Sequence, residues 1–345
     1  MIFPIILSVS ILISFVTTFV ITPYFIKFLY LAGIVGLDLQ KRNRPKLPTS
    51  GGICVAFGIL SGLLSYIGLH TFVSGSEIDV IPLLAVTSSI LIVMFVGLLD
   101  DLNVKSRAVK TKEGSDIRVG FPQWIKPLLT LPAAIPLMVI SAGETTMAIP
   151  LIGRVHFGIF YPLLLIPIGM VGASNAVNLL AGFNGLEAGM GIVYFLGLGI
   201  FSLLHRGAGS DVLNGSVVFL AAFAALAGFI RYNWYPAKIL PGDSLTYLLG
   251  SMVAAGVIVG NMERSGILVM LPFIIEFFLK LRVKFRATCL GKLRGDGKLN
   301  PPYGRKIYSW THLLMNLRSM TEKQVTITLI LIQLGFTIII FLPIK

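Results

Sequence analysis

The chain has 345 residues, of which 55% are hydrophobic and only 12% charged, and its net charge is +13. Soluble domains carry about 25% charged residues, so this composition excludes an ordinary soluble protein and indicates an integral membrane protein. Cys54 and Cys289 offer no disulfide framework. No nucleic-acid partner is expected, because the basic residues cluster in loops between apolar runs, where they set membrane orientation or meet phosphate.

Ten apolar runs approach the length of about 20 residues that a helix needs to cross a bilayer. The first run lacks the basic start and the small-residue cleavage site of a signal peptide, so it is interpreted as a retained helix. Residues 145–158, TTMAIPLIGRVHFG, are predicted to form a short β-hairpin or loop outside the membrane. The runs cover residues 3–31, 52–69, 81–99, 127–142, 159–180, 188–205, 213–231, 244–260, 264–281 and 324–343.

Lysine and arginine are distributed very unevenly between the two sets of loops. One set, with the helix ends that flank it, holds 24 of the 28, ten of them between Arg282 and Lys323. The opposite loops and the C-terminus hold four: Arg154, Arg206, Arg264 and Lys345. Basic loops stay in the cytoplasm, so both termini are expected outside. The predicted fold is an all-α membrane protein of about ten helices, with residues 1–345 as one domain and a cytoplasmic loop at 282–323.

Polar residues gather at the cytoplasmic ends of three predicted helices. The third helix ends in LLDDLN with Asp100 and Asp101, the fifth ends in NAVNLLAGFNG, and the eighth begins after PGDS with Asp243. Odd-numbered helices finish inside and even-numbered helices start inside. These motifs should therefore converge on the cytoplasmic face.

Asp100 and Asp101 need a cation nearby. They end a helix whose macrodipole already places partial negative charge there, and their own charges repel. A metal ion, Lys105 or Lys126 would offset this charge. The alternative is a solvated acidic loop start that merely pairs with neighbouring basic residues.

The other polar residues also have structural explanations. Asp243 stands at the start of a predicted helix, where aspartate is a favoured N-cap residue. Asn175 and Asn178 are spaced i,i+3 and share a helix face, where they could join helices. Asn184-Gly185 is typical of a turn. Only their predicted gathering on one membrane side favours a functional site.

The residue types favour phosphate chemistry with a hard metal ion. Mg²⁺ is commonly held by one or two carboxylates plus substrate phosphates and water, which Asp243 and an asparagine carbonyl could supply. The four histidines are scattered, and no GxxxxGK[ST] motif indicates ATP hydrolysis. Lys126 and the basic run Arg282, Lys284 and Arg286 fit phosphoryl transfer from a diphosphate, or simply membrane anchoring.

Three motifs carry a resemblance to a known family. NAVNLLAGFNGLEAG at 175–189, LLDDLN, and NWYPAKILPGDSLTY resemble the polyprenyl-phosphate N-acetylhexosamine-1-phosphate transferases, most closely their dolichol branch, over nearly the whole chain. Bacterial relatives carry an aspartate-rich version of the first motif, where this chain has Ala181 and Asn184. The chain length and the short last loop look archaeal.

The resemblance implies roles for individual residues. Asn178 and Asp243 are implied as ligands of Mg²⁺, for which Mn²⁺ could substitute, Lys126 as the contact to the lipid phosphate, and Asn184 as a uridine contact. The catalytic set is Asp100, Asp101 and Lys126, and the substrate-binding set is Leu37, Asp38, Leu39, Thr49, Asn175, Asn184 and Arg286. Arg286 is the nearest match to the family's basic diphosphate signature, because KFRATCLGKLRGDGKL contains no histidine.

The expected function is transfer of GlcNAc-1-phosphate from UDP-GlcNAc to dolichyl or another polyprenyl phosphate. The products would be lipid-diphospho-GlcNAc and UMP, at the cytoplasmic face of the cell membrane in an archaeon or of the endoplasmic reticulum in a eukaryote. Alternatives are another UDP-sugar or undecaprenyl phosphate as substrate, a lipid or ion transporter, and an inactive homologue. The sequence leaves open whether the protein forms a homodimer.

Overall fold

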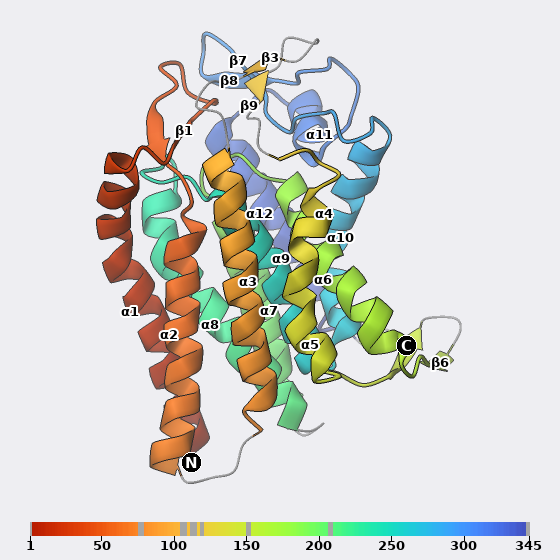
Figure 1. Cartoon of the computed structure of the whole chain (residues 1–345). Helices are drawn as coiled ribbons and strands as arrows, with labels where there is room; N and C mark the ends of the chain where they lie inside the picture. The colour runs from red at the N-terminus through yellow and green to blue at the C-terminus, as the bar shows by residue number, and fades with distance from the viewer. Residues whose placement is uncertain are drawn as a thin grey trace.

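The computed structural model is a bundle of long helices with small strands and one short helix gathered at one end (Figure 1). That end carries β1, β7, β8, β9 and α11, and the N-terminus lies at the other end. The structure describes residues 2–74, 79–103, 109–110, 116–117, 121–149, 153–205 and 210–342.

Among these residues, eight helical segments are long and apolar enough to cross a membrane. Their bounds match eight of the ten predicted runs to within about four residues at almost every end. The long helices are α1 (Ile2–Leu31), α2 (Gly52–Leu69, continued by the π-helical turn η1, His70–Ser74), α3 (Ile81–Asn103), α6 (Ile166–Leu179, preceded by η3, Tyr161–Leu165), α7 (Leu186–Leu204), α8 (Ser210–Asn233), α9 (Gly242–Val259) and α12 (Glu322–Ile339).

The two remaining predicted spans are helical but fall short of the length or the apolarity of the others. One is broken into α4 (Lys126–Thr130), the 3₁₀ turn η2 (Leu131–Ala134) and α5 (Ile135–Val139). Prolines 127, 132 and 136 interrupt it, because proline lacks the backbone N–H that a continuous helix needs. The other is α10 (Glu263–Leu281), which carries four charged side chains: Glu263, Arg264, Glu276 and Lys280. Ten crossings therefore stay a prediction.

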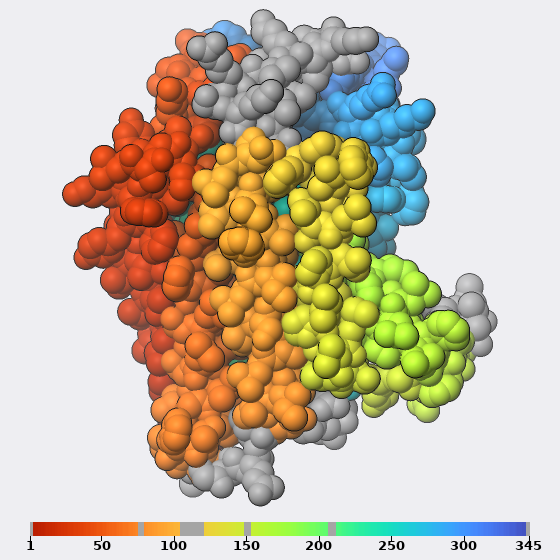
Figure 2. All heavy atoms as spheres, in the orientation of Figure 1, coloured from red at the N-terminus to blue at the C-terminus, as the bar shows by residue number. Residues whose placement is uncertain are grey.

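The surface of the bundle is apolar. Figure 2 shows α1, α2, α3 and the α4–α5 segment side by side on one face, with the segment around η3 projecting from the side. Leucines and phenylalanines stand exposed on that segment, as on the other spans; Phe160, Leu163 and Leu164 are 65%, 58% and 51% exposed. Such a surface suits lipid rather than water.

Both termini lie away from the end of the bundle that carries β1, β7, β8 and β9 (Figure 1). The ring of Phe3 contacts Tyr66 near the end of α2, at 6.4 Å between centroids. Phe341 contacts Phe201 near the end of α7, at 5.8 Å. Since α2 and α7 both begin at the opposite end, this agrees with termini that share one side of the membrane.

The predicted hairpin between residues 145 and 158 is confirmed as β5 (Thr146–Ile149) paired antiparallel with β6 (Gly153–His156). The 282–323 region folds around α11 (Trp310–Leu317) and a three-stranded sheet. Its strands are β7 (Lys292–Leu293), β8 (Lys298–Asn300) and β9 (Met320–Thr321), and the other pairs are β1 (Val35–Leu37) with β2 (Lys46–Pro48) and β3 (Val109–Lys110) with β4 (Asp116–Ile117).

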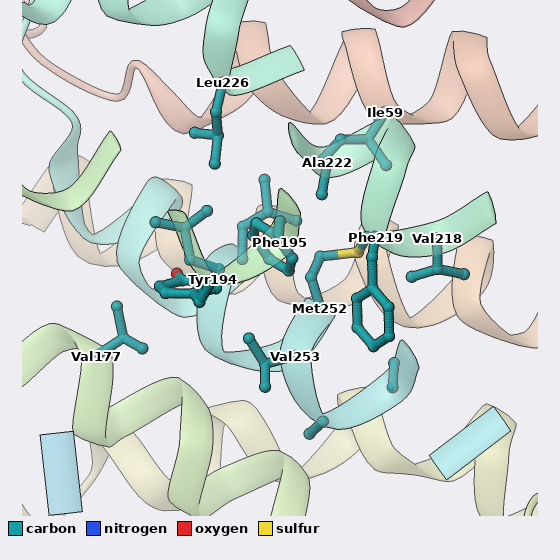
Figure 3. Close-up of a cluster of buried hydrophobic side chains, with 14 of the residues drawn as sticks. Ile59, Val177, Tyr194, Phe195, Val218, Phe219, Ala222, Leu226, Met252 and Val253 are labelled. Carbon is teal, nitrogen blue, oxygen red and sulfur yellow. The ribbon is translucent and has the colours of Figure 1, made fainter. Parts of the chain in front are cut away.

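Helix α9 is the central helix of the bundle, since 89% of its residues are buried inside the protein. Figure 3 shows Met252 and Val253 of α9 beside Phe195 of α7 and Phe219 of α8, all buried. These aromatic and aliphatic side chains form the core that holds α9 in place.

Glycines let the neighbouring helices reach the start of α9. A Cβ on Gly97 of α3 would lie 2.4 Å from the Ser244 Cα, and one on Gly52 of α2 would lie 2.3 Å from the Leu245 nitrogen. Farther along, a Cβ on Gly250 would meet the Ala173 carbonyl oxygen of α6 at 2.2 Å. Small residues allow this close packing of membrane helices. The first turn of α9 is therefore fixed against α2 and α3.

His312 of α11 predicts a pH dependence of stability. Burial lowers the pKa of His312 to about 4. Its Nδ1 accepts a bond from the Tyr308 nitrogen at 3.2 Å, so Nε2 donates to the Thr288 oxygen at 2.8 Å and the ring is neutral. An unfolded histidine has a pKa of about 6.5, so this stabilisation is complete above that pH and is lost as pH falls toward 4.

We therefore expect the melting temperature in detergent to fall as pH is lowered from about 7 to 4. His312→Gln keeps a donor for Thr288 and should flatten this dependence. An identical pH profile for the variant would contradict the role given to His312.

Candidate active site

Side chains from four helices meet at the end of the bundle that carries the small strands. Asp100 and Asp101 lie in the last turn of α3, Lys126 opens α4, Asp243 is in the first turn of α9, and Asn178 is near the end of α6. This confirms the predicted convergence of the helix ends. Asp100, Asp101 and Lys126 are buried residues, with 0%, 6% and 6% exposure. The alternative prediction, that the two aspartates begin a solvated acidic loop, is therefore wrong.

Lys126 is the centre of the charged group. Its Nζ lies 2.7 Å from Asp100 Oδ2 and 2.6 Å from Asp243 Oδ2. One ammonium thus joins a carboxylate of α3 to a carboxylate of α9. Lys126 is thus the cation predicted beside Asp100, whereas Asp101 accepts from backbone nitrogens instead. Lys105 lies outside the described residues.

The Asp100 carboxylate is fixed on both oxygens. Oδ1 accepts a hydrogen bond from the Phe121 nitrogen at 2.8 Å, and Oδ2 accepts one from the Tyr247 hydroxyl, also at 2.8 Å. Tyr247 was missed by the sequence reasoning. Its position four residues after Asp243, on the same face of α9, was the available signal.

Asp101 caps a helix from outside that helix. Its Oδ1 accepts from the Asp243 nitrogen at 2.6 Å and its Oδ2 from the Ser244 nitrogen at 3.2 Å. Both N–H groups lie in the first turn of α9, where the helix itself supplies no backbone acceptor. The N-cap position itself is Pro241, with no side-chain cap bond. The interpretation of Asp243 as N-cap is therefore wrong, and the Asp243 carboxylate is turned to Lys126.

Asp101→Ala should lower the free energy of unfolding by about 1–2 kcal/mol, the usual cost of losing a helix cap. Asp101→Asn keeps one acceptor and should lose less. Thermal melting in detergent measures both. An alanine variant as stable as the wild type would show that the cap contributes nothing to the fold.

The two asparagines of α6 contact different neighbours. Asn178 Oδ1 accepts a bond from the Thr246 hydroxyl of α9 at 3.1 Å. Asn175 Nδ2 donates to Thr130 Oγ1 at 3.0 Å and to the Val171 oxygen at 2.9 Å. Asn175 thus joins α6 to α4, as the alternative predicted, while Asn178 faces the first turns of α9.

The group has the donor chemistry of a Mg²⁺ site, although the described residues hold no group of three or more His, Cys, Asp or Glu residues placed to hold a metal ion together. Three carboxyl groups and one ammonium meet in a mostly buried place. Carboxyl groups thus outnumber the ammonium, and a further cation would offset this excess. Asp243 is the most open of them, with 23% exposure. Oxygen-only donors beside an opening fit Mg²⁺ that shares its coordination with a substrate phosphate.

A basic pocket of about 480 Å³ lies between the loop that joins β1 to β2 and the β7–β8 hairpin. Gln40 joins the two walls by donating to the Gly291 oxygen at 3.4 Å. The size suits a nucleotide-sized ligand and the charge suits an anion. Its lining residues are Leu39, Gln40, Lys41, Arg42, Arg44, Thr288, Leu290, Gly291, Lys292, Leu293, Arg294, Gly295 and Pro302.

The predicted substrate-binding residues are not all brought to this pocket. Leu39 lines it. Leu37 is paired in β1 opposite Lys46, and the Thr49 nitrogen donates to the Ile34 oxygen. Arg286 lines a separate pocket of about 300 Å³ with Tyr303 and Tyr308 among others.

Asn184 is the centre of a second polar group. Its Oδ1 accepts from the Ala237 nitrogen at 2.9 Å and from Lys41 Nζ at 3.2 Å, and its Nδ2 donates to Asp38 Oδ2 at 3.2 Å. Glu322 of α12 accepts from the Asn184 nitrogen at 2.9 Å. Lys41 and Glu322 were missed by the sequence reasoning; an acid in the first turn of an apolar helix was the only signal for Glu322.

The helical bundle, its apolar surface and the family match of residues 83–261 define a multi-pass membrane protein, with charged side chains gathered at one end of the bundle. Residues 83–261 match the glycosyl transferase family 4, and the chain belongs to that family. It is 35% identical to a Saccharolobus solfataricus protein over 92% of this chain and 91% of the relative. That relative is provisionally named a UDP-N-acetylglucosamine–dolichyl-phosphate N-acetylglucosaminephosphotransferase.

Two further relatives carry the same activity in their names. A Sulfolobus acidocaldarius protein, also provisionally named, is 31% identical over 96% of this chain and 94% of the relative. The enzyme of Dictyostelium discoideum is 27% identical over 88% of this chain and 79% of the relative. The family resemblance inferred from the three motifs is thus confirmed.

Proposed function

We propose that this chain transfers GlcNAc-1-phosphate from UDP-GlcNAc to dolichyl or a related polyprenyl phosphate. The products are lipid-diphospho-GlcNAc and UMP, and the reaction is the first step of lipid-linked oligosaccharide synthesis for protein N-glycosylation. The carrying observation is the Asp100–Lys126–Asp243 group at the helix ends, in a chain whose relatives bear this activity in their names. The active face is proposed to be cytoplasmic, on the side with most of the lysine and arginine.

The proposed reaction is a direct in-line displacement. An oxygen of the lipid phosphate attacks the β-phosphorus of UDP-GlcNAc and forms a new P–O bond. The bond from that phosphorus to the oxygen bridging the two phosphates breaks, and UMP leaves with the bridging oxygen. The lipid phosphate needs no strong base, because the second pKa of a phosphate monoester is about 6.

The described contacts suit orientation more than proton transfer. Asp101 uses both oxygens on the backbone of α9, and Asp100 uses both on the Phe121 nitrogen, Tyr247 and Lys126. We infer that these two aspartates hold α9 and Lys126 in position. Lys126, which joins Asp100 to Asp243, is proposed to attract the lipid phosphate.

Asp243 and Asn178 are the proposed ligands of Mg²⁺ or Mn²⁺. The ion would neutralise negative charge on the donor diphosphate. The Thr246 hydroxyl lies 3.1 Å from Asn178 Oδ1 and 3.2 Å from the Asp243 carbonyl oxygen, and its one proton is shared between these two acceptors. It therefore sets the two proposed ligands relative to each other.

The test is incubation of purified protein with Mg²⁺, radiolabelled UDP-GlcNAc and dolichyl phosphate. We expect labelled lipid diphosphate and UMP in equal amounts, and no product when a chelator is added. Parallel reactions with other UDP-sugars and undecaprenyl phosphate test the alternative substrates. Absence of product with every combination would contradict the proposal.

A further inference from the structure

Lys41 is held in a buried network away from the proposed metal ligands. Its side chain is 15% exposed and forms an ion pair with Glu322, whose side chain is 4% exposed. It also lies 3.3 Å from Asp38 Oδ2 and 3.2 Å from Asn184 Oδ1, with its Nζ 4.2 Å from the centre of the Tyr235 ring. One ammonium thus joins four segments that are distant in sequence.

All three hydrogens of the Lys41 ammonium have partners: Asp38, Asn184 and Glu322. An ammonium has three donors and no acceptor, so none is left for a substrate phosphate. Glu322 uses both carboxylate oxygens, with Oε2 on Lys41 and Oε1 on the Asn184 nitrogen. Lys41 also lines the basic pocket, so the pair fixes part of the pocket wall as well as the groups that it holds.

The groups held by the pair belong to chain segments that lead to the site. Asn184 follows the α6 end that carries Asn178, and Tyr235 belongs to the segment that leads into α9 and Asp243. Asp38 precedes Leu39 and Gln40, which line the basic pocket. Glu322 opens α12, outside the residues 83–261 that match the family. The last helix is therefore tied to the pocket wall through Lys41.

We propose that Lys41 and Glu322 are positioning residues for the nucleotide-sugar. Their ion pair fixes the loop at residues 38–41 and the Asn184 amide against the start of α12, so that the pocket wall is preformed when UDP-GlcNAc arrives. This inference rests on the proposed function. It predicts that the pair governs affinity for the nucleotide-sugar more than the chemical step.

The test measures UDP-GlcNAc binding by titration calorimetry without lipid acceptor, and then steady-state kinetics. Lys41→Met and Glu322→Gln should each raise the Kd for UDP-GlcNAc about 10- to 100-fold, the usual effect of removing a group that orients a ligand-binding side chain. The kcat and the KM for dolichyl phosphate should change far less. Lys41→Arg keeps the charge and should retain most of the affinity.

Two further variants make the result decisive. Lys41→Met/Glu322→Gln removes both charges, so neither is left buried alone; its Kd should be no worse than that of either single variant, because the pair acts as a unit. Lys46→Met, an exposed lysine of the same loop, should bind as the wild type does.

Unchanged Kd in Lys41→Met and Glu322→Gln, with a wild type that binds, would overturn the inference and leave the proposed function standing. Strictly additive losses in the double variant would overturn the pairing. A wild type that binds no UDP-sugar would contradict the proposed function, and the positioning role would fall with it.

Discussion

Replacing Lys126 with methionine is expected to abolish turnover and to destabilise the protein. The change leaves Asp100 and Asp243 without the ammonium that lies 2.7 Å and 2.6 Å from them. Removing one partner of a buried ion pair costs about 3–5 kcal/mol, because the remaining charge stays buried. The lipid phosphate would also lose its proposed cation, which typically costs about 10²–10³ in kcat.

The measurements are melting temperature in detergent and initial rate with saturating UDP-GlcNAc and dolichyl phosphate. Lys126→Arg separates the two effects, since it keeps the charge but cannot reproduce the position of the ammonium. It should restore stability more than activity. A methionine variant with wild-type melting temperature and rate would exclude Lys126 from the site.

Replacing Asp243 with asparagine is expected to remove metal dependence together with activity. The substitution keeps the shape and one acceptor for Lys126, but it removes the carboxylate that is proposed to bind the divalent cation. The rate should fall about 10²–10³-fold or more. The melting temperature should change little, because Lys126 keeps its ion pair with Asp100.

Binding of Mn²⁺ followed by electron paramagnetic resonance provides a readout independent of turnover. Bound Mn²⁺ should be lost in Asp243→Asn and in Asn178→Ala. Asp79→Asn is the matched control, because Asp79 is an exposed acid before the first turn of α3, at the opposite end of that helix from Asp100. Wild-type Mn²⁺ binding by Asp243→Asn would place the metal elsewhere.

The sequence predicted the helices and their convergence because both depend on local properties. Apolar length defines the spans, and the alternation of helix direction brings Asp100 and Asp243 to the same end. Lys126 was found in the same way, as a cation that opens a span on that side. The hairpin at 145–158 was predicted as a hairpin or loop in the segment between two apolar runs.

The roles of individual residues depend on contacts that sequence does not show. Asp243 has the residue type of a helix cap, yet the cap is Asp101, 142 residues away. Only the close approach of α3 to α9 at Gly97 makes this possible. The second polar group is a similar case, because it joins Asn184, Lys41 and Glu322 from three separate chain segments. Nothing in the local sequence of one segment predicts its contact with the other two.

The central claim is that a sugar phosphate, and not a sugar alone, moves to the lipid. UDP-GlcNAc labelled with ³²P at the β-phosphate tests it most directly, with purified protein, Mg²⁺ and dolichyl phosphate. The label should appear in the lipid fraction, with unlabelled UMP as the soluble product. Label that remains in soluble UDP while GlcNAc reaches the lipid, or no labelled lipid with active protein, would contradict the account.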